Sequence, residues 1–390
     1  MNYFKIAAFF IIVSCFSACA LRGDNSDNNN NSNNNNNSSN NNNDPVGWTL
    51  VGDANISGGA AQGPIIRFYD HVPYVAFLDD PSGSRTVRVM KYNSSSGTWE
   101  DVGTDFSAGS DHLAFEIDSS SGTLYVAYSD GTQSGKLTVR KFSGGVWSNV
   151  GSVGFSTGAV EWVALALKGG TTPYVAYYDT DVGQNRIKVQ KYSGAWNILS
   201  DASIVPGDNI SITADSTNVY LAYRIISTNK LSLKKYNATD TLSSIASPNA
   251  DQINYTSVFI EGNSLYLTYI DLDDSNKAVA KVYDTVGTAW SSIGSVDSVL
   301  SDDAAAAPYI YVNNSSTPHD VIYVAYQDIY SSSKASVKTC LNDPSSTWSA
   351  LGGLGLSSTS ITTISIYLDN AHPYVAYINA TSDGIEVKKY

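Results

Sequence analysis

The feature that most constrains the fold is a strand-like segment that begins with Tyr and occurs seven times. The copies read YVAFLD, YVAYSD, YVAYYD, YLAYRI, YLTYID, YVAYQD and YVAYIN, starting at Tyr74, Tyr125, Tyr174, Tyr220, Tyr266, Tyr323 and Tyr374. Aromatic and β-branched residues of this kind favour strands. A spacing near 50 residues between copies is typical of repeat architectures. We number the repeats 1 to 7 after these tyrosines.

Repeats 1 to 6 each contain three more strand-like segments, and repeat 7 contains two. One follows the Tyr segment and reads VRVMKY in repeat 1 and IEVKKY in repeat 7. The next carries a tryptophan in most repeats: Trp99, Trp147, Trp196, Trp290 and Trp348, with Leu242 in repeat 4. A further apolar stretch precedes every Tyr segment. Four short strands joined by Gly, Ser, Asn and Asp turns are typical of a propeller blade. We therefore predict an all-β fold, a seven-bladed β-propeller of four-stranded blades.

The two ends of this region complement each other. Repeat 7 runs to Tyr390 without a tryptophan segment, and a matching segment, GWTLVG, stands ahead of repeat 1 at residues 47–52. We expect residues 47–52 to complete the last blade and close the ring within a domain spanning 47–390. Closure removes the exposed edge of an open sheet stack. An open solenoid is the alternative, and it would leave repeat 7 with three strands.

Two positions of the Tyr segment repeat with little variation. One is small, Ala in six repeats and Thr268 in repeat 5, and the next is always Phe or Tyr. Alternation along a strand puts the two on opposite faces. We interpret them as core layers between blades. Cys340, the one cysteine outside the N-terminal region, stands where other repeats have Tyr or Phe, so we expect it to be a buried small hydrophobe.

The N-terminal region predicts export and anchoring. Residues 1–18 resemble a signal peptide, with Lys5 ahead of a short apolar run. Phe16-Ser17-Ala18-Cys19 resembles a bacterial lipobox, which makes Cys19 the lipidated residue; ordinary cleavage after Ala18 is the alternative. Ala20, rather than Asp, after the cysteine favours the outer membrane or cell surface. The Asn- and Ser-rich stretch within 19–46 has almost nothing to bury and predicts a disordered tether.

The composition limits the classes of molecule that the protein is expected to bind. The formal net charge of −13 and the pI near 4.6 argue against nucleic acid, because an acidic surface repels phosphates. We expect contact with a membrane only through the lipid anchor, and a monomer.

Carboxylates recur at the end of the Tyr segment. They are Asp79, Asp130, Asp179, Asp271 and Asp328, with Asn379 in repeat 7 and Ile225 in repeat 4. In a propeller they would lie around one rim and could bind a cation, an amine or a sugar. The alternative is that each accepts backbone N–H groups within its own turn.

Residues that break the repeat are better candidates for specific binding. Tyr178, Arg224 and Gln327 occupy the variable position just before the aspartate series. Trp162 lies outside the repeated tryptophan segment, and we expect it in the first strand of repeat 3, lining the channel. The expected ligand-binding residues are thus these four together with the five aspartates.

No cofactor is predicted. Calcium is the one ion whose ligand spacing occurs, at Asp179 and Asp181 and at Asp271 and Asp273, but neither loop continues to the distal Glu of an EF-hand. No catalytic residue is assigned. The G-x-S-x-G match at 154–158 falls in a loop rather than in the strand-turn-helix context that the motif needs.

The PYVAYxD, VxKY and W..VG segments of residues 47–390 resemble the repeats of secreted bacterial β-propeller lipoproteins. That resemblance implies an envelope protein and attaches no activity. We expect a binding module that contacts a glycan or a protein through the propeller face and channel mouth. A glycan hydrolase or lyase using channel-mouth carboxylates such as Glu116 and Glu161 is one alternative, and a structural or assembly subunit is another.

Overall fold

The computed structural model describes residues 47–80, 85–107, 112–181, 186–199, 205–248, 251–294, 299–313 and 319–390. The signal peptide over 1–18, the lipidation site Cys19 and the tether over 19–46 lie outside these residues and stay predictions. Within the described residues no helix is long and apolar enough to cross a membrane.

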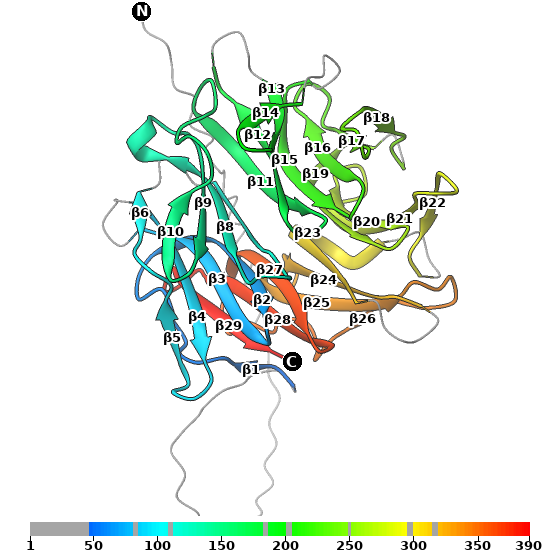
Figure 1. Cartoon of the computed structure of the whole chain (residues 1–390). Coiled ribbons are helices and arrows are strands. Elements are labelled where there is room, and N and C mark those ends of the chain that lie inside the picture. The colour runs from blue at the N-terminus through cyan, green and yellow to red at the C-terminus, as the bar shows by residue number, and fades with distance from the viewer. Residues whose placement is uncertain are drawn as a thin grey trace, which may run out of the picture. The chain divides into compact units, whose positions relative to one another are not determined.

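The described chain is built from strands, with one short 3-10 turn, η1 (Gly131–Gln133) (Figure 1). Repeats 1 to 3 contain β2 (Ala61–Tyr69), β3 (Val72–Asp79), β4 (Thr86–Asn93), β5 (Thr98–Asp101), β6 (Phe106–Ser107), β7 (Leu113–Ile117), β8 (Leu124–Asp130), β9 (Lys136–Ser143), β10 (Val146–Asn149), β11 (Val160–Lys168), β12 (Thr172–Asp179), β13 (Arg186–Tyr192) and β14 (Trp196–Ile198). Repeats 4 and 5 contain β15 (Gly207–Ala214), β16 (Val219–Ile225), β17 (Lys230–Tyr236), β18 (Leu242–Ile245), β19 (Ile253–Glu261), β20 (Ser264–Asp271), β21 (Lys277–Asp284) and β22 (Ala289–Ser292). Repeats 6 and 7 contain β23 (Val299–Asn313), β24 (Val321–Asp328), β25 (Lys334–Leu341), β26 (Ser349–Ala350), β27 (Ile361–Asp369), β28 (His372–Asn379) and β29 (Gly384–Lys389), and β1 (Thr49–Leu50) precedes repeat 1.

Strands of one repeat pair antiparallel in chain order. Four sheets have four strands each, β2 to β5 form a sheet to which β6 adds, and repeats 5 and 6 share a sheet because β21 also pairs with β23. The predicted all-β fold of four-stranded antiparallel units is confirmed, and the fold is β-propeller-like. The first strands of successive repeats contact one another, and β27 contacts β2.

The N-terminal strand belongs to the last repeat's sheet. β1 pairs with β29 through Thr49 and Leu50 only, so the predicted strand over 47–52 is shorter than expected. Trp48 precedes it and is 1% exposed. Its indole nitrogen donates to the Leu351 carbonyl at 2.8 Å, and its ring lies 5.4 Å from that of Tyr390.

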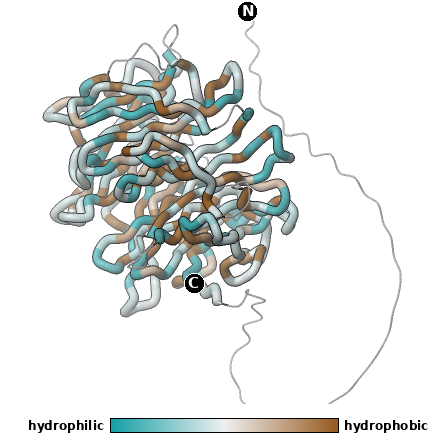
Figure 2. Tube along the Cα trace, turned by 90° about the vertical axis from the view of Figure 1, so that its right-hand side faces the viewer, coloured by the Kyte–Doolittle hydropathy of each residue, from teal (hydrophilic) through white to brown (hydrophobic). Residues whose placement is uncertain are grey.

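Repeated residues hold neighbouring sheets together. The small and aromatic residues of the Tyr segment are at most 1% exposed, as predicted (Ala76, Ala127, Ala176, Ala222, Thr268, Ala325, Ala376; Phe77, Tyr128, Tyr177, Tyr223, Tyr269, Tyr326, Tyr377). Four more tryptophans donate an indole N–H to a carbonyl of the preceding sheet or segment at 2.7–2.8 Å (Trp99, Trp147, Trp196, Trp290). Figure 2 shows hydrophobic and hydrophilic stretches alternating along the strands of the body.

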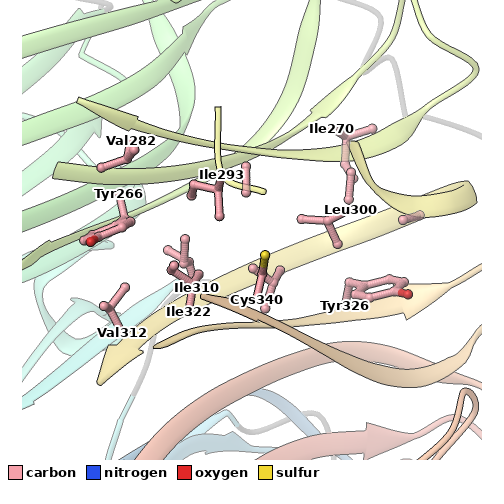
Figure 3. Packing of buried hydrophobic residues seen from close by; sticks show 14 residues of the cluster. Tyr266, Ile270, Val282, Ile293, Leu300, Ile310, Val312, Ile322, Tyr326 and Cys340 are labelled. Carbon is pink, nitrogen blue, oxygen red and sulfur yellow. The ribbon is translucent and has the colours of Figure 1, made fainter. Parts of the chain in front are cut away.

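Cys340 is buried, as predicted. It is 4% exposed and lies in a cluster with Leu300, Ile310 and Ile322 (Figure 3). Burial raises the pKa of its thiol to about 11. A buried thiol of this kind is inert at neutral pH.

Asp240 links repeats 3 and 4. From the turn after β17 it accepts hydrogen bonds from the Tyr174 hydroxyl at 2.6 Å and the Lys191 ammonium at 2.8 Å. Partial burial raises the pKa of Asp240, but these two donors outweigh that effect and lower the pKa below its ordinary value.

We expect Asp240→Asn to lower the free energy of unfolding at neutral pH by about 1 kcal/mol, because two donors lose a charged acceptor. Since the folded-state pKa is depressed, this contribution is present above the unfolded value near 4. It is lost as the pH falls through the folded value. Urea unfolding at pH 7 and pH 3 would show the gap between variant and parent closing at the lower pH. A gap that is the same at both pH values would contradict the role of the charge.

Candidate functional site

The first strands of all seven repeats line one cavity of about 390 Å³. In each repeat one residue of the first strand pairs in register with the repeated tyrosine. These seven residues, which we call the ring position, are Arg67, Glu116, Ala166, Thr213, Phe259, Tyr311 and Tyr367, and all of them line the cavity. The ring position is therefore variable in a chain whose core positions scarcely change.

An ion pair forms one wall of the cavity. Arg67 donates from Nε and Nη2 to the two carboxylate oxygens of Glu116, at 3.0 and 2.7 Å. Its Nη2 also donates to the Tyr309 hydroxyl at 2.9 Å. Burial lowers the pKa of Arg67, but the Glu116 charge and the hydrogen bonds outweigh it and the pKa is raised. The guanidinium and carboxylate cancel in charge while keeping fixed, directional polar groups in the cavity.

Aromatic rings form the adjoining wall. The Tyr311 ring lies 4.7 Å from that of Phe259 and 4.6 Å from that of Tyr367. Tyr367 in turn stacks on Phe68 at 5.6 Å. Burial, together with a hydrogen bond between Tyr311 and Tyr367, raises the pKa of Tyr311, so its hydroxyl stays protonated at neutral pH. Ala166 and Thr213 complete the ring position with the two smallest of its side chains.

The N-terminal ends of the first strands, which lie away from the ring position, are irregular. In six of the described first strands the pairing with the second strand shifts register near the start. Trp162, Asn209 and Tyr255 lie at these shifts with φ near +50°. Such a conformation is strained for an aromatic residue and clusters at functional sites. Trp162 is partly exposed there, with its ring 5.1 Å from that of His112.

Three of the four repeat-breaking residues lie at this end of repeats 3 and 4. Tyr178 pairs in register with Glu161, and burial followed by the charges of Glu161 and Asp208 raises its pKa. Arg224 donates from Nε and Nη2 to Asp208 at 2.7 and 2.5 Å. Gln327 is separate, because its side-chain amide donates to the Ile361 carbonyl of the next repeat.

The aspartate series is buried rather than displayed on a rim. The five side chains belong to residues that are at most 8% exposed (Asp79, Asp130, Asp179, Asp271, Asp328). Asp130, Asp271 and Asp328 each accept a backbone N–H two or three residues along their own turn. This geometry favours the turn interpretation, and a binding role for the five aspartates stays a prediction.

Three of the four carboxylates proposed for calcium, those of Asp179, Asp271 and Asp273, already accept hydrogen bonds. Asp179 accepts from the Lys188 ammonium at 2.7 Å and from the backbone of Gly158 and Asp181. Asp271 accepts the N–H of Asp273, whose carboxylate accepts the N–H of Gln252. Across the described ranges no group of three or more His, Cys, Asp or Glu is placed to hold a metal ion.

The two glutamates of the hydrolase alternative do not converge. Glu116 occupies the ring position and is held by Arg67. Glu161 lies on β11 five residues before Ala166, the ring-position residue of that strand, which is roughly 15 Å along a strand. An acid–base carboxylate pair needs a separation of about 5 to 9 Å.

Sequence reasoning missed the ring position. Its residues precede the repeated tyrosine by seven positions in four repeats but by eight, nine and twelve in repeats 3, 2 and 6. Hairpins of different length therefore hide the register, and only the strand pairing aligns the seven residues.

Comparisons with known proteins address the fold. No protein-family model matches the chain, and no curated protein does. A solved structure of a triple arginine-to-alanine mutant of AofleA from Arthrobotrys oligospora is similar with a TM-score of 0.50 and 11% identity, over 78% of this chain and 90% of that one. A prolyl endopeptidase structure is similar with a TM-score of 0.47 and 14% identity, over 78% of this chain and 45% of that one.

Proposed function

We propose that this chain is a lipid-anchored binding module of the bacterial envelope, with a seven-bladed β-propeller closed by residues 47–52. The pairing of β1 with β29 and the contact between β27 and β2 support the closed ring. Lipidation at Cys19 and an outer-membrane or surface location rest on the sequence of residues 16–20.

The ligand that fits the cavity best is a neutral polyhydroxylated molecule, a glycan. The observation that carries this proposal is that the equivalent position of the seven repeats holds six residue types, and that all seven residues line one cavity. Ligand pockets of roughly 300 to 1,000 Å³ are typical of small-molecule sites, and 390 Å³ falls in that range. Aromatic walls suit the apolar faces of a sugar ring. The Arg67–Glu116 pair and Tyr309 supply donors and acceptors for hydroxyls without a net charge.

We propose further that the residues at the irregular starts of the first strands contribute to binding at the other end of the channel. Trp162, Tyr178 and Arg224 offer an aromatic face and a guanidinium within the same two repeats. The same glycan-binding test also bears on the two alternatives. If the protein binds no glycan, a protein ligand or a role as an assembly subunit is what is left.

We expect Thr213→Tyr to weaken glycan binding at least 10-fold, because the larger side chain takes up volume of the cavity that Thr213 lines. The substitution copies what repeats 6 and 7 already carry at the ring position, so the strand can accept it. The matched control is Thr217→Tyr, an exposed position in the following turn, which should bind as the parent does.

A glycan array of the purified protein would identify the ligand, and titration calorimetry would then compare the variants. Binding that survives Thr213→Tyr would exclude the cavity as the site. If any added tyrosine weakened binding wherever it stood, the Thr217→Tyr control would weaken binding by a similar factor as Thr213→Tyr. That result would also argue against the cavity as the site.

A further inference from the structure

We infer a second binding site, for a primary alkylammonium group such as a lysine side chain, in a cavity of about 500 Å³ between repeats 6 and 7. Its lining includes Tyr323, Thr339 and Leu351 from repeat 6 and His372 and Tyr390 from repeat 7. This site is distinct from the channel cavity, with which it shares no lining residue.

The repeat itself shows which group is missing there. In the third strand one residue pairs in register with the repeated tyrosine, and it is Lys in five repeats (Lys91, Lys141, Lys191, Lys235, Lys389), Val282 in repeat 5 and Thr339 in repeat 6. The ammonium of that lysine lies 5.7 Å from the ring centroid of Tyr174 in repeat 3 and 5.7 Å from that of Tyr220 in repeat 4. In repeat 7 the corresponding distance, to Tyr374, is 5.3 Å. These are cation–π distances.

In repeat 6, Thr339 stands where five other repeats have lysine, so Tyr323 has no such ammonium beside it and the cavity occupies that space. Thr339 and Tyr323 pair in register, and both line the cavity. A threonine side chain is too short to cover the tyrosine ring. Tyr323 is 9% exposed and lines the cavity, so the cavity reaches the tyrosine ring that repeats 3, 4 and 7 pair with an ammonium of the same chain.

An unsatisfied hydroxyl is an independent sign of a ligand. Thr339 Oγ1 is buried and has no hydrogen-bond partner within the described chain. A buried hydroxyl without a partner costs stability, and an ammonium has three donors to offer its lone pairs. Because Oγ1 is shielded from solvent, the Thr339 side chain would have to rotate for this hydroxyl to accept from an ammonium in the cavity.

The surroundings suit an alkylammonium better than an anion. The lining contains no Lys or Arg, and the chain carries a formal charge of −13, which draws cations. Leu351 and the ring of Tyr390 provide apolar contact for an alkyl stem, which long charged side chains use readily. A cavity of this volume accommodates a lysine side chain with its flanking amides.

The first experiment compares two probes of equal length. Nα-acetyl-lysine methylamide and the Nα-acetyl methylamide of 2-aminoheptanoic acid, which carries a methyl group in place of the ammonium, would be titrated into the protein and followed by NMR. We expect the lysine probe to bind at least 5-fold more tightly. Equal binding of the two probes, or none of the lysine probe, would overturn the assignment of a cation site.

The second experiment restores the lysine of the other repeats. Thr339→Lys should reduce binding of the lysine probe at least 10-fold, because the variant supplies its own ammonium to Tyr323. Thr217→Lys adds the same charge at an exposed turn and should leave binding unchanged. Equal weakening by both variants would indicate a bulk charge effect and overturn the site.

Two further variants keep the test decisive. If Thr339→Lys does not fold, Thr339→Val takes its place, because it replaces the hydroxyl with a methyl group and should weaken binding of the lysine probe 2- to 5-fold. Unchanged binding would show that the hydroxyl is not part of the site. Thr213→Tyr, which blocks the channel cavity, should leave the lysine probe unaffected. Loss of lysine binding in that variant would place the probe in the channel instead.

Discussion

Replacement of Trp48 by Ala is expected to lower the free energy of unfolding by about 3 to 5 kcal/mol. Trp48 is 1% exposed, and its indole N–H bonds the Leu351 carbonyl. It also fills the space above Gly352, where an added Cβ would meet the indole at 2.7 Å. β1 pairs with β29 through two residues, and backbone hydrogen bonds from Val51 to Val387 and from Ile56 to Ile385 extend the contact, so this side chain adds the large buried surface.

Trp147→Ala is the matched control, since Trp147 bonds the Val102 carbonyl in the same way but is partly exposed. We expect it to cost about half as much. Urea unfolding followed by far-UV circular dichroism measures both without depending on tryptophan fluorescence. A loss below about 1 kcal/mol for Trp48→Ala, or equal losses for the two, would argue against closure through this strand.

The second large effect concerns the same substitution at two equivalent positions. Asp179→Asn is expected to cost about 3 kcal/mol, because it leaves the Lys188 ammonium, whose side chain is 9% exposed, without its buried carboxylate. Asp271→Asn is expected to be neutral within about 0.5 kcal/mol or stabilising. Burial raises the pKa of Asp271, so its charge is unfavourable in the folded state.

Repeat 7 shows why the second substitution should be tolerated. Asn379 stands at the equivalent position and accepts the N–H groups of Thr381 and Ser382 through its amide oxygen. Thermal or urea unfolding of the two variants compares them directly. If Asp271→Asn cost as much as Asp179→Asn, the carboxylate charge would matter in every turn and the Lys188 pair would not be special.

The sequence predicted the parts of the fold that every repeat shares. Ala176 and Tyr177 recur at fixed offsets from the repeated tyrosine, and both are fully buried because identical interfaces need identical side chains. The tryptophan segments are predictable for the same reason, since Trp99 and Trp196 make equivalent hydrogen bonds from the indole N–H to a backbone carbonyl in two different repeats.

The site is harder to predict because it lies where the repeats differ. Arg67 stands within an otherwise apolar strand segment, and its pairing with Glu116 joins residues 49 positions apart on two first strands. The aspartates stand out because they recur, yet the recurrence reflects turn formation in Asp130 and Asp271. Trp162 lies in a first strand, as predicted, but its positive φ comes from a register shift that no sequence pattern announces.

The ring position separates architecture from recognition in a way that bears on how such a protein could diversify. Its seven side chains are set by separate repeats, and the repeated core residues of the Tyr segment lie on the second strand of each repeat. Thr213 could therefore change on its own, whereas residues in contact, such as Arg67 with Glu116 and Tyr311 with Tyr367, would have to change together. Seven variable positions around one cavity form a combinatorial surface, so a small number of exchanges at these positions could redirect an ancestral scaffold, or a designed one, to a new ligand.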